Sequence, residues 1–251
     1  MTSPIAVIGG TGLTSLDTLK ITHRQTVSTP YGDPSSPLTH GELGGRSVVF
    51  LARHGQQHTL PPHKINYRAN LWALHRLGVQ QVIAVAAVGG IRHDMAPGAL
   101  AFPDQLVDYT WGRHGTFFED DLSHVTHIDF TEPYCPALRE RLIQDARALE
   151  LDARESCTYA AMQGPRLETA AEVRKLERDG CDIVGMTGMP EAALARELDL
   201  SYVTCAVVAN RAAGKAPGEI TMAEIQQNLV SGMVRVKMLL ARSIPTLSDP
   251  L

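Results

Sequence analysis

The side chains best suited to chemistry follow short apolar runs of the chain. Thr11 stands within a glycine turn directly after residues 5–8, and Arg53 and His54 directly follow residues 47–52. A glycine turn offers backbone N–H groups to a small oxyanion, and an arginine fork beside an imidazole suits a doubly charged phosphate. These residues indicate a phosphate site, although a tight turn and a solvated strand end would give the same pattern.

Three more polar residues stand at or near the ends of later apolar runs. Glu168 follows the run 157–162, Thr187 the run 182–186, and Asn210 the run 202–208. Taken singly, residues such as Glu168 and Asn210 are more often helix caps or turn residues than ligands of a substrate. A role in binding a substrate is indicated only if the fold brings these strand ends together.

The chain lacks several familiar sequence patterns of binding and catalytic sites. The dinucleotide fingerprint is broken because Ser15 stands where a third glycine is needed, and the chain contains no phosphate-binding P-loop and no G-x-S-x-G elbow. A zinc site from His54, His58 and His63 is conceivable, but Gly55 and two prolines oppose the helix that would align them. We therefore expect no metal.

The elements that must position these residues alternate between strand and helix. Apolar runs predict strands over 5–8, 47–52, 82–88, 157–162, 182–186 and 202–208, and helical spacing predicts helices over 66–78, 136–149 and 168–179, one around Pro190 and one from 222. Such alternation predicts an α/β fold: a single domain over residues 1–251 with a mixed, mostly parallel sheet flanked by helices. Ligands of such sheets bind beyond the carboxyl ends of the strands.

Composition excludes other classes of protein. The chain has 251 residues, a formal net charge of −4 and 44% hydrophobic residues, with basic and acidic residues interspersed. No basic block could neutralise a row of phosphates or lie on an anionic membrane, so nucleic acid and membranes are not expected as partners. Without a signal peptide or spanning segment the expected location is cytoplasmic, with its four separated cysteines reduced.

Read together, the ordered motifs of the chain resemble those of the trimeric purine nucleoside phosphorylases, specifically the methylthioadenosine phosphorylase branch. The motifs run nearly from end to end and comprise residues 9–13, 53–59, 66–74, 87–90, 163–166 and 186–191. The resemblance implies that inorganic phosphate, a co-substrate, attacks C1′ of a purine nucleoside, and it implies no cofactor. It also implies a homotrimer.

By this resemblance the phosphate is held by Thr11, Arg53, His54, the backbone near Ala87 and the hydroxyl of Thr187. Met186 would lie against the ribose. Two departures stand out, since Ala86 replaces a common Thr or Asn and Gly188 replaces a common Thr. They predict a thinner phosphate shell on one side.

Two positions address the purine base. Adenine-cleaving relatives carry two Asp residues where this chain has Asn210 and Ala212, and a Ser where it has Glu168, next to Leu167. An Asn amide can donate to O6 and accept from N7–H, and a carboxylate accepts the N1–H that adenine lacks. Asn210 and Glu168 therefore both favour a 6-oxopurine and, with His54, are the expected catalytic residues.

The 5′ end of the substrate is addressed by Met222 and Ile225. Inosine phosphorylases carry a histidine where Met222 stands, and a thioether beside an isoleucine favours an apolar 5′-methylthio group. Met222 fits equally well as a core position of an amphipathic helix. His127 resembles a residue that the neighbouring subunit contributes over this pocket.

The expected reaction is phosphorolysis of 5′-methylthioinosine to hypoxanthine and 5-methylthioribose 1-phosphate. The main alternative is a broader methylthioadenosine or inosine and guanosine phosphorylase. A non-catalytic nucleoside-binding protein is disfavoured by Arg53, His54 and Thr187, and a dinucleotide-dependent oxidoreductase by the broken glycine fingerprint.

Overall fold

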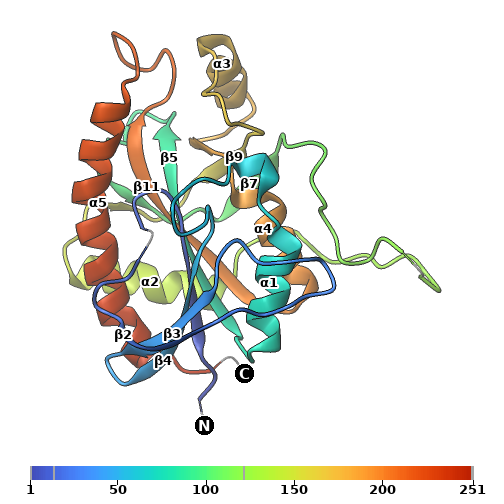
Figure 1. Ribbon diagram of the computed structural model, residues 1–251. Coiled ribbons are helices and arrows are strands. Elements are labelled where there is room, and N and C mark those ends of the chain that lie inside the picture. The colour runs from blue at the N-terminus through green and yellow to red at the C-terminus, as the bar shows by residue number, and fades with distance from the viewer. Residues whose placement is uncertain (1, 14, 121, 250–251) are drawn as a thin grey trace.

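The fold is built on a mixed, mostly parallel β-sheet, seen in a computed structural model that describes residues 2–13, 15–120 and 122–249 (Figure 1). The strands are β1 (Ile5–Gly9), β2 (Lys20–Gln25), β3 (Leu38–Leu43), β4 (Arg46–Ala52), β5 (Gln81–Gly90), β6 (Leu100–Ala101), β7 (Gln105–Asp108), β8 (Ala153–Arg154), β9 (Thr158–Ala161), β10 (Ile183–Gly185) and β11 (Ser201–Arg211). The helices are α1 (Tyr67–Arg76), α2 (Pro136–Ala148), α3 (Ala170–Arg178), α4 (Gly188–Glu197) and α5 (Met222–Ser243), with 3-10 turns at Pro62–Lys64 and Ile244–Thr246.

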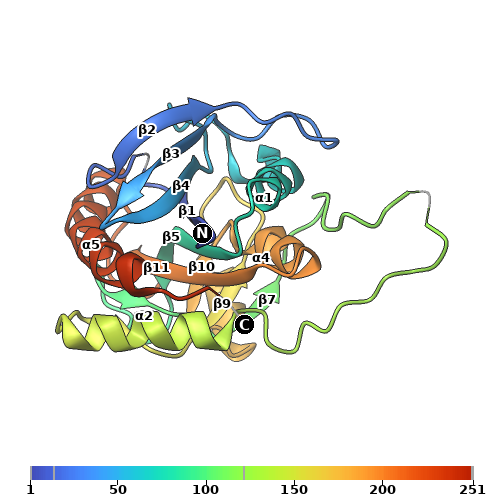
Figure 2. The same ribbon diagram turned by 90° about the horizontal axis from the view of Figure 1, so that it is seen from below.

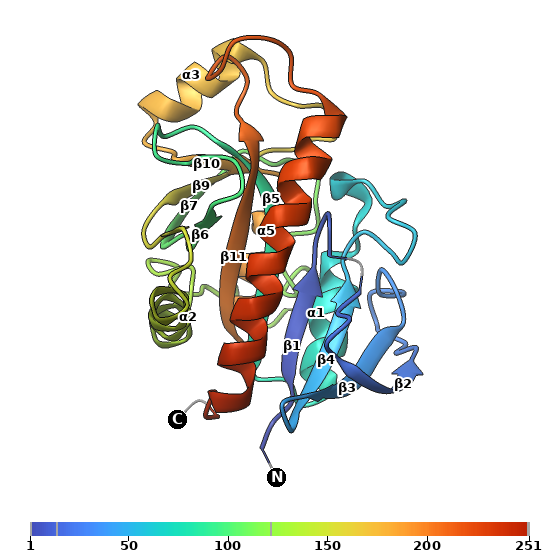
Figure 3. The same cartoon turned by 90° about the vertical axis from the view of Figure 1, so that its left-hand side faces the viewer.

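The centre of the sheet is parallel. β1 pairs with β4 and with β5, and β11 pairs with β5 along its whole length, all in parallel register. The carboxyl ends of β1, β4, β5 and β11 therefore face the same end of the molecule, opposite the two chain termini (Figure 3). This arrangement brings together the polar residues that follow separate apolar runs.

Helices cover both faces of the sheet (Figure 2). On one face, α5 and α2 pack on β1, β4, β5 and β11 through a cluster that includes Leu142, Val207 and Val236. On the other face, α1 and α4 pack through a cluster that includes Leu74 and Leu194. The sheet is thus buried on both sides, which is why its strands read as continuous apolar runs rather than as alternating ones.

Local signals place the helix starts. The side chain of Asn66 caps α1 by accepting from the amide of Ala69 at 3.1 Å, and complete capping boxes at Thr169 and Thr221 begin α3 and α5. The predicted helix 168–179 was therefore placed slightly too early, because the cap at Thr169 leaves Glu168 in the preceding loop. Strands β2, β3, β6, β7 and β8 were not predicted.

No helix within the described residues is long and apolar enough to cross a membrane.

Candidate active site

A pocket of about 260 Å³ lies where the carboxyl ends of the central strands meet. Every site residue predicted from the sequence lines it except one. The lining residues among them are Thr11, Arg53, His54, Ala87, Leu167, Glu168, Met186, Thr187, Asn210, Ala212, Met222 and Ile225. His127 instead lies exposed on the long segment between β7 and α2, which projects away from the body of the chain (Figure 1).

A break in one edge of β5 makes room for the pocket. β11 occupies one edge of β5 throughout, while the other edge pairs with β1 as far as Ala84 and with β10 from Gly89 onward. Among the described strands, none pairs with the stretch between these two residues on that second edge. Its Val85 carbonyl instead accepts a hydrogen bond from Arg53 Nη1 at 2.9 Å.

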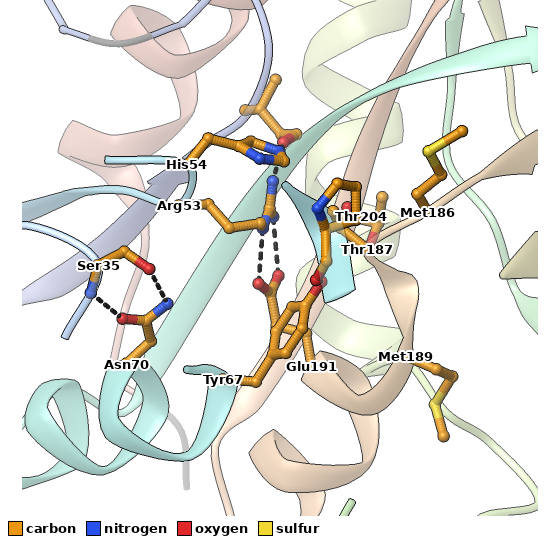
Figure 4. Close-up of polar contacts among 12 residues, drawn as sticks. Ser35, Arg53, His54, Tyr67, Asn70, Met186, Thr187, Met189, Glu191 and Thr204 are labelled. Atoms are coloured by element: carbon orange, nitrogen blue, oxygen red, sulfur yellow. Dashed lines mark hydrogen bonds and ion pairs between the residues drawn. The ribbon is translucent and has the colours of Figure 1, made fainter. Parts of the chain in front are cut away.

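Arg53 is buried and already carries a partner. Its Nε and Nη2 atoms donate to the two carboxylate oxygens of Glu191 at 2.6 and 2.8 Å, and Arg53 and Glu191 are only 1% and 0% exposed (Figure 4). Tyr202 adds a hydroxyl donor to the same carboxylate at 2.8 Å. Burial alone would lower the pKa of Arg53, but the adjacent charge and hydrogen bonds of Glu191 outweigh it and hold the pKa above its usual value.

This pairing changes the expected role of Arg53. The planar fork predicted to grip phosphate is occupied by Glu191, and two N–H bonds, one on Nη1 and one on Nη2, remain for a ligand. The close fit explains Gly10, because a Cβ there would lie 2.9 Å from Arg53 Nη1 and 2.5 Å from the Val85 carbonyl oxygen. Arg53 therefore offers the pocket a directed donor with most of its charge already compensated.

His54 is held as a neutral imidazole. Burial lowers its pKa to about 4; the hydrogen bond to Leu60 opposes this shift, and the charges of Arg53 and His58 add to it. Its Nδ1 lies 2.8 Å from the carbonyl oxygen of Leu60, and because a carbonyl only accepts, Nδ1 must carry the proton. Nε2 then has a free lone pair, so His54 presents an acceptor to a ligand.

Two hydroxyl groups complete this side of the pocket. Thr187 is 7% exposed, lines the pocket beside the Tyr159 hydroxyl, and precedes α4 without using its side chain as a cap. The Thr11 hydroxyl lies 3.4 Å from His58 Nε2. Thr11, His54 and Thr187 thus surround one region with neutral hydrogen-bonding groups, together with Arg53, whose charge is paired with Glu191.

The opposite side of the pocket holds Glu168 and Asn210. Burial raises the pKa of Glu168 above its usual value. A bulge between Val208 and Asn210 shifts the register of β11 against β5, and the carbonyl of the intervening Ala209 accepts from Asn228 Nδ2 at 2.8 Å. Asn210 Nδ2 donates to the carbonyl of Arg211 at 2.7 Å, which leaves Oδ1 available as an acceptor.

The third side is apolar. Met222 is the first residue of α5 and is 63% exposed at the pocket, and Ile225 is buried one turn further on. The alternative reading of Met222 as a core residue is therefore wrong. Its thioether lies where a ligand or a covering segment could contact it.

Several partners of the site residues were not predicted from the sequence. Glu191 belongs to a motif that was recognised, yet its pairing with Arg53 across 138 positions gave no local signal. Arg113, discussed below, and Asn228 belong to no motif. Within the described residues no group of three His, Cys, Asp or Glu side chains could hold a metal ion, so His54, His58 and His63 do not form a zinc site.

Comparison with known proteins gives a consistent result over the whole chain. The family model described as "Phosphorylase superfamily" matches residues 4–245. A protein of Pseudomonas syringae pv. tomato named probable S-methyl-5'-thioinosine phosphorylase is 57% identical over 237 residues, which are 94% of this chain and 96% of that protein. The 6-oxopurine nucleoside phosphorylase of Pyrococcus furiosus is 44% identical over 246 residues, which are 96% and 92% of the two chains.

Similarity in structure points the same way. The methylthioadenosine phosphorylase of Schistosoma mansoni, solved in complex with adenine, superposes with a TM-score of 0.93. It is 32% identical in sequence, and the match covers 96% of this chain and 91% of the other.

Proposed function

The chain belongs to the phosphorylase superfamily, and from this premise we propose that it is a pentosyltransferase that cleaves 5′-methylthioinosine with inorganic phosphate. The products are hypoxanthine and 5-methylthioribose 1-phosphate. One observation carries the proposal: a single pocket brings Glu168 and Asn210 together with Arg53 and His54. The relatives named as thioinosine and 6-oxopurine phosphorylases support the same choice of base.

In the proposed reaction the C1′–N9 bond breaks and a bond from C1′ to a phosphate oxygen forms. The electron pair of the broken bond moves onto the purine, and the sugar gains oxocarbenium character. Phosphate bound by Thr11, Arg53, His54, Thr187 and the Ala87 backbone acts as the nucleophile, and its negative charge also stabilises the sugar. Most of the rate enhancement then comes from positioning and from charges fixed in advance.

His54 has a specific task in this scheme. Because its Nδ1–H is engaged with Leu60, its Nε2 accepts the hydrogen bond of the phosphate O–H. The other phosphate oxygens then accept from Arg53 and the two threonines. The orientation of phosphate is thereby tied to its protonation state.

At the base, Glu168 accepts N1–H as negative charge develops on the leaving purine. N7 then takes up a proton, balanced by the one that the phosphate O–H loses to solvent, and Asn210 Oδ1 accepts the resulting N7–H. Leu167 and Ala212 lie beside the base, and Met186 lies against the ribose. A site built around such hydrogen bonds rejects an analogue that lacks them by about 10⁴–10⁵ when it is fully desolvated. Methylthioadenosine is therefore a poor substrate in this proposal.

The 5′-methylthio group contacts Met222 and Ile225, and we propose that His127 of a neighbouring subunit closes this side in a homotrimer. His127 is remote from the pocket of its own chain and lies on a projecting segment, as a residue contributed to another subunit would. Light scattering of the purified protein tests the trimer. A monomer with full activity would refute it.

The remaining expectations complete the proposal. Residues 1–251 form one phosphorylase domain that acts in the cytoplasm, and the reaction needs phosphate but no metal or other cofactor. Nucleic acid and membranes are not partners. Activity retained after treatment with a metal chelator would support the metal-free mechanism.

The deciding experiment follows release of the base from methylthioinosine, methylthioadenosine, inosine and adenosine, each with and without phosphate. Phosphate-dependent hypoxanthine release, fastest from methylthioinosine, is the expected result. Faster adenine release would refute the roles given to Glu168 and Asn210. Equal turnover of inosine would refute only the role of Met222.

A further inference from the structure

Arg113 connects two segments that line the pocket, although it belongs to no recognised motif. The first pocket segment is residues 162–168, and the second is residues 186–189. Arg113 lies beyond β7, at the base of the projecting segment. Its Nη1 donates to the backbone carbonyls of Met186 and Met189, at 2.8 and 2.6 Å.

The same guanidinium reaches the first pocket segment through its other two nitrogens. Nη2 donates to the carbonyl of Gln163 at 2.8 Å and to that of Met162 at 3.3 Å, while Nε donates to the side-chain oxygen of Gln163 at 3.2 Å. Four backbone carbonyls from two separate segments therefore converge on Arg113. Carbonyl groups cannot hydrogen-bond to one another, so a planar donor with several N–H groups is needed to hold them in this arrangement.

The two pocket segments are also in close contact. Gly164 has φ +61°, and a Cβ at this position would lie 2.4 Å from the sulfur of Met186. The guanidinium of Arg113 further lies 5.6 Å from the ring centre of Tyr67, whose hydroxyl donates at 3.0 Å to the carbonyl of Pro62, a residue of the pocket wall. A shift of Arg113 would therefore displace residues on several sides of the pocket.

We propose that Arg113 is a positioning residue that holds the base-binding side of the pocket in register with its ribose- and phosphate-binding side. The first pocket segment carries Glu168, and the second carries Met186 and Thr187. The Met162 amide joins the two at their start by donating to the Gly185 carbonyl at 2.8 Å, and the Arg113 bonds fix their separation beyond that point. The inference rests on the proposed function, since it concerns how that reaction is aligned. A misplacement of about 1 Å far from the reacting atoms can cost about 10²-fold in rate.

Two variants test the proposal. Arg113→Met removes every donor, and Arg113→Lys keeps the charge but offers three donors without the planar geometry. For Arg113→Met we expect kcat/KM for methylthioinosine to fall about 100-fold, with a fall of about tenfold in its preference over methylthioadenosine, because Glu168 loses its alignment. Arg113→Lys should be intermediate, and millimolar guanidinium ion should partly restore Arg113→Met.

Arg92→Met is the matched control. Arg92 pairs with Asp94 and Asp182 at 2.6 and 3.2 Å and does not line the pocket, so its loss destabilises the protein without releasing the pocket segments. We expect a lower Tm and an unchanged ratio of kcat/KM values. If Arg113→Met behaves like this control, with no change in base preference and no rescue by guanidinium, the proposal is wrong.

Amide hydrogen exchange supplies a readout that does not depend on turnover. Exchange in residues 162–168 and 186–189 should be faster in Arg113→Lys than in the wild-type protein, and unchanged there in Arg92→Met. Unchanged exchange in Arg113→Lys would overturn the positioning role even if the variant folds normally. A wild-type protein that releases no base from any nucleoside would refute the proposed function instead, while the exchange comparison still tests the Arg113 bonds.

Discussion

Exchanging the two base-binding residues should redirect the enzyme from hypoxanthine to adenine. Glu168→Ser removes the acceptor for N1–H, and Asn210→Asp supplies a carboxyl group that can donate to N7 and accept from the amino group of adenine. The quantity to measure is the ratio of kcat/KM for methylthioinosine to that for methylthioadenosine. Both residues line the same pocket, so their effects bear on one bound base.

The size of the effect follows from the bonds exchanged. A hydrogen bond to a charged group contributes about 1.5–3 kcal/mol, and a buried acceptor left unpaired costs about 1–3 kcal/mol. Because Glu168 is only partly buried, we take about 3 kcal/mol for Glu168→Ser, which corresponds to a roughly 10²-fold change in the ratio. Asn210→Asp exchanges weaker bonds, worth about tenfold. Because the two residues share one base and are coupled, the double variant should shift the ratio by about 10²- to 10³-fold.

The assay is release of hypoxanthine or adenine under phosphate saturation for both single variants, the double variant and a control. Glu155→Ser is a suitable control because it makes the same exchange at a carboxylate that pairs with Arg147 and does not line the pocket. It should leave the ratio unchanged. A double variant whose ratio matches that of Glu155→Ser would refute the base-recognition argument.

Three further predictions concern other parts of the site. Met222→His should raise kcat/KM for inosine relative to methylthioinosine by about tenfold, as expected for the exchange of one small apolar contact, and the same base-release assay measures it. Glu191→Gln should lower the free energy of unfolding by about 3 kcal/mol, because Arg53 stays buried without its counter-charge; in urea unfolding, phosphate should stabilise this variant more than the wild type, and equal stabilisation would contradict the shared use of Arg53. His54 has a pKa of about 4 in the folded protein against about 6.5 when unfolded, so the unfolded state binds a proton first as the pH drops. The free energy of unfolding should therefore fall by up to about 3 kcal/mol between about pH 6.5 and 4. Urea unfolding across that range measures this dependence, and His54→Gln should flatten it.

The pocket could be anticipated from the sequence because of how parallel sheets are built. Thr11, Arg53 and Asn210 each follow or end an apolar run, and the parallel pairing of β1, β4 and β11 around β5 places them at one end of the sheet. Thr187 follows β10, which runs antiparallel to β5, so this rule does not account for its place. The helix starts could also be predicted from the sequence, because a capping box involves residues within four positions of one another. The pattern therefore predicted the site from local signals and one topological rule.

The partners of these residues could not be predicted in the same way. Glu191 acts on Arg53, 138 positions away. Arg113 bonds mainly to backbone carbonyls at least 49 positions away, and carbonyls leave no trace in residue type. Strands β2 and β3 escaped prediction because β2 is exposed along its whole length and shows no apolar alternation. The role proposed for His127 involves a neighbouring subunit and stays a prediction.

The pairing of Arg53 with Glu191 suggests how the pocket balances its affinity for phosphate. Among the described residues that line the pocket, Arg53 is the only one with a permanent positive charge, and Glu191 already compensates it. Phosphate would then be bound mainly by hydroxyl and amide dipoles and by the neutral imidazole of His54.

Such binding depends on direction and attracts phosphate only weakly from a distance, because the attraction of a dipole falls off with distance more steeply than that of a free charge. Phosphate should therefore keep enough negative charge to stabilise the oxocarbenium-like sugar instead of having it cancelled by a nearby cation. The sugar phosphate product would be held by the same dipoles and released readily, as a reversible phosphorolysis requires. A weak dependence of the phosphate KM on ionic strength would follow, whereas a steep dependence would indicate that Arg53 acts as a free charge.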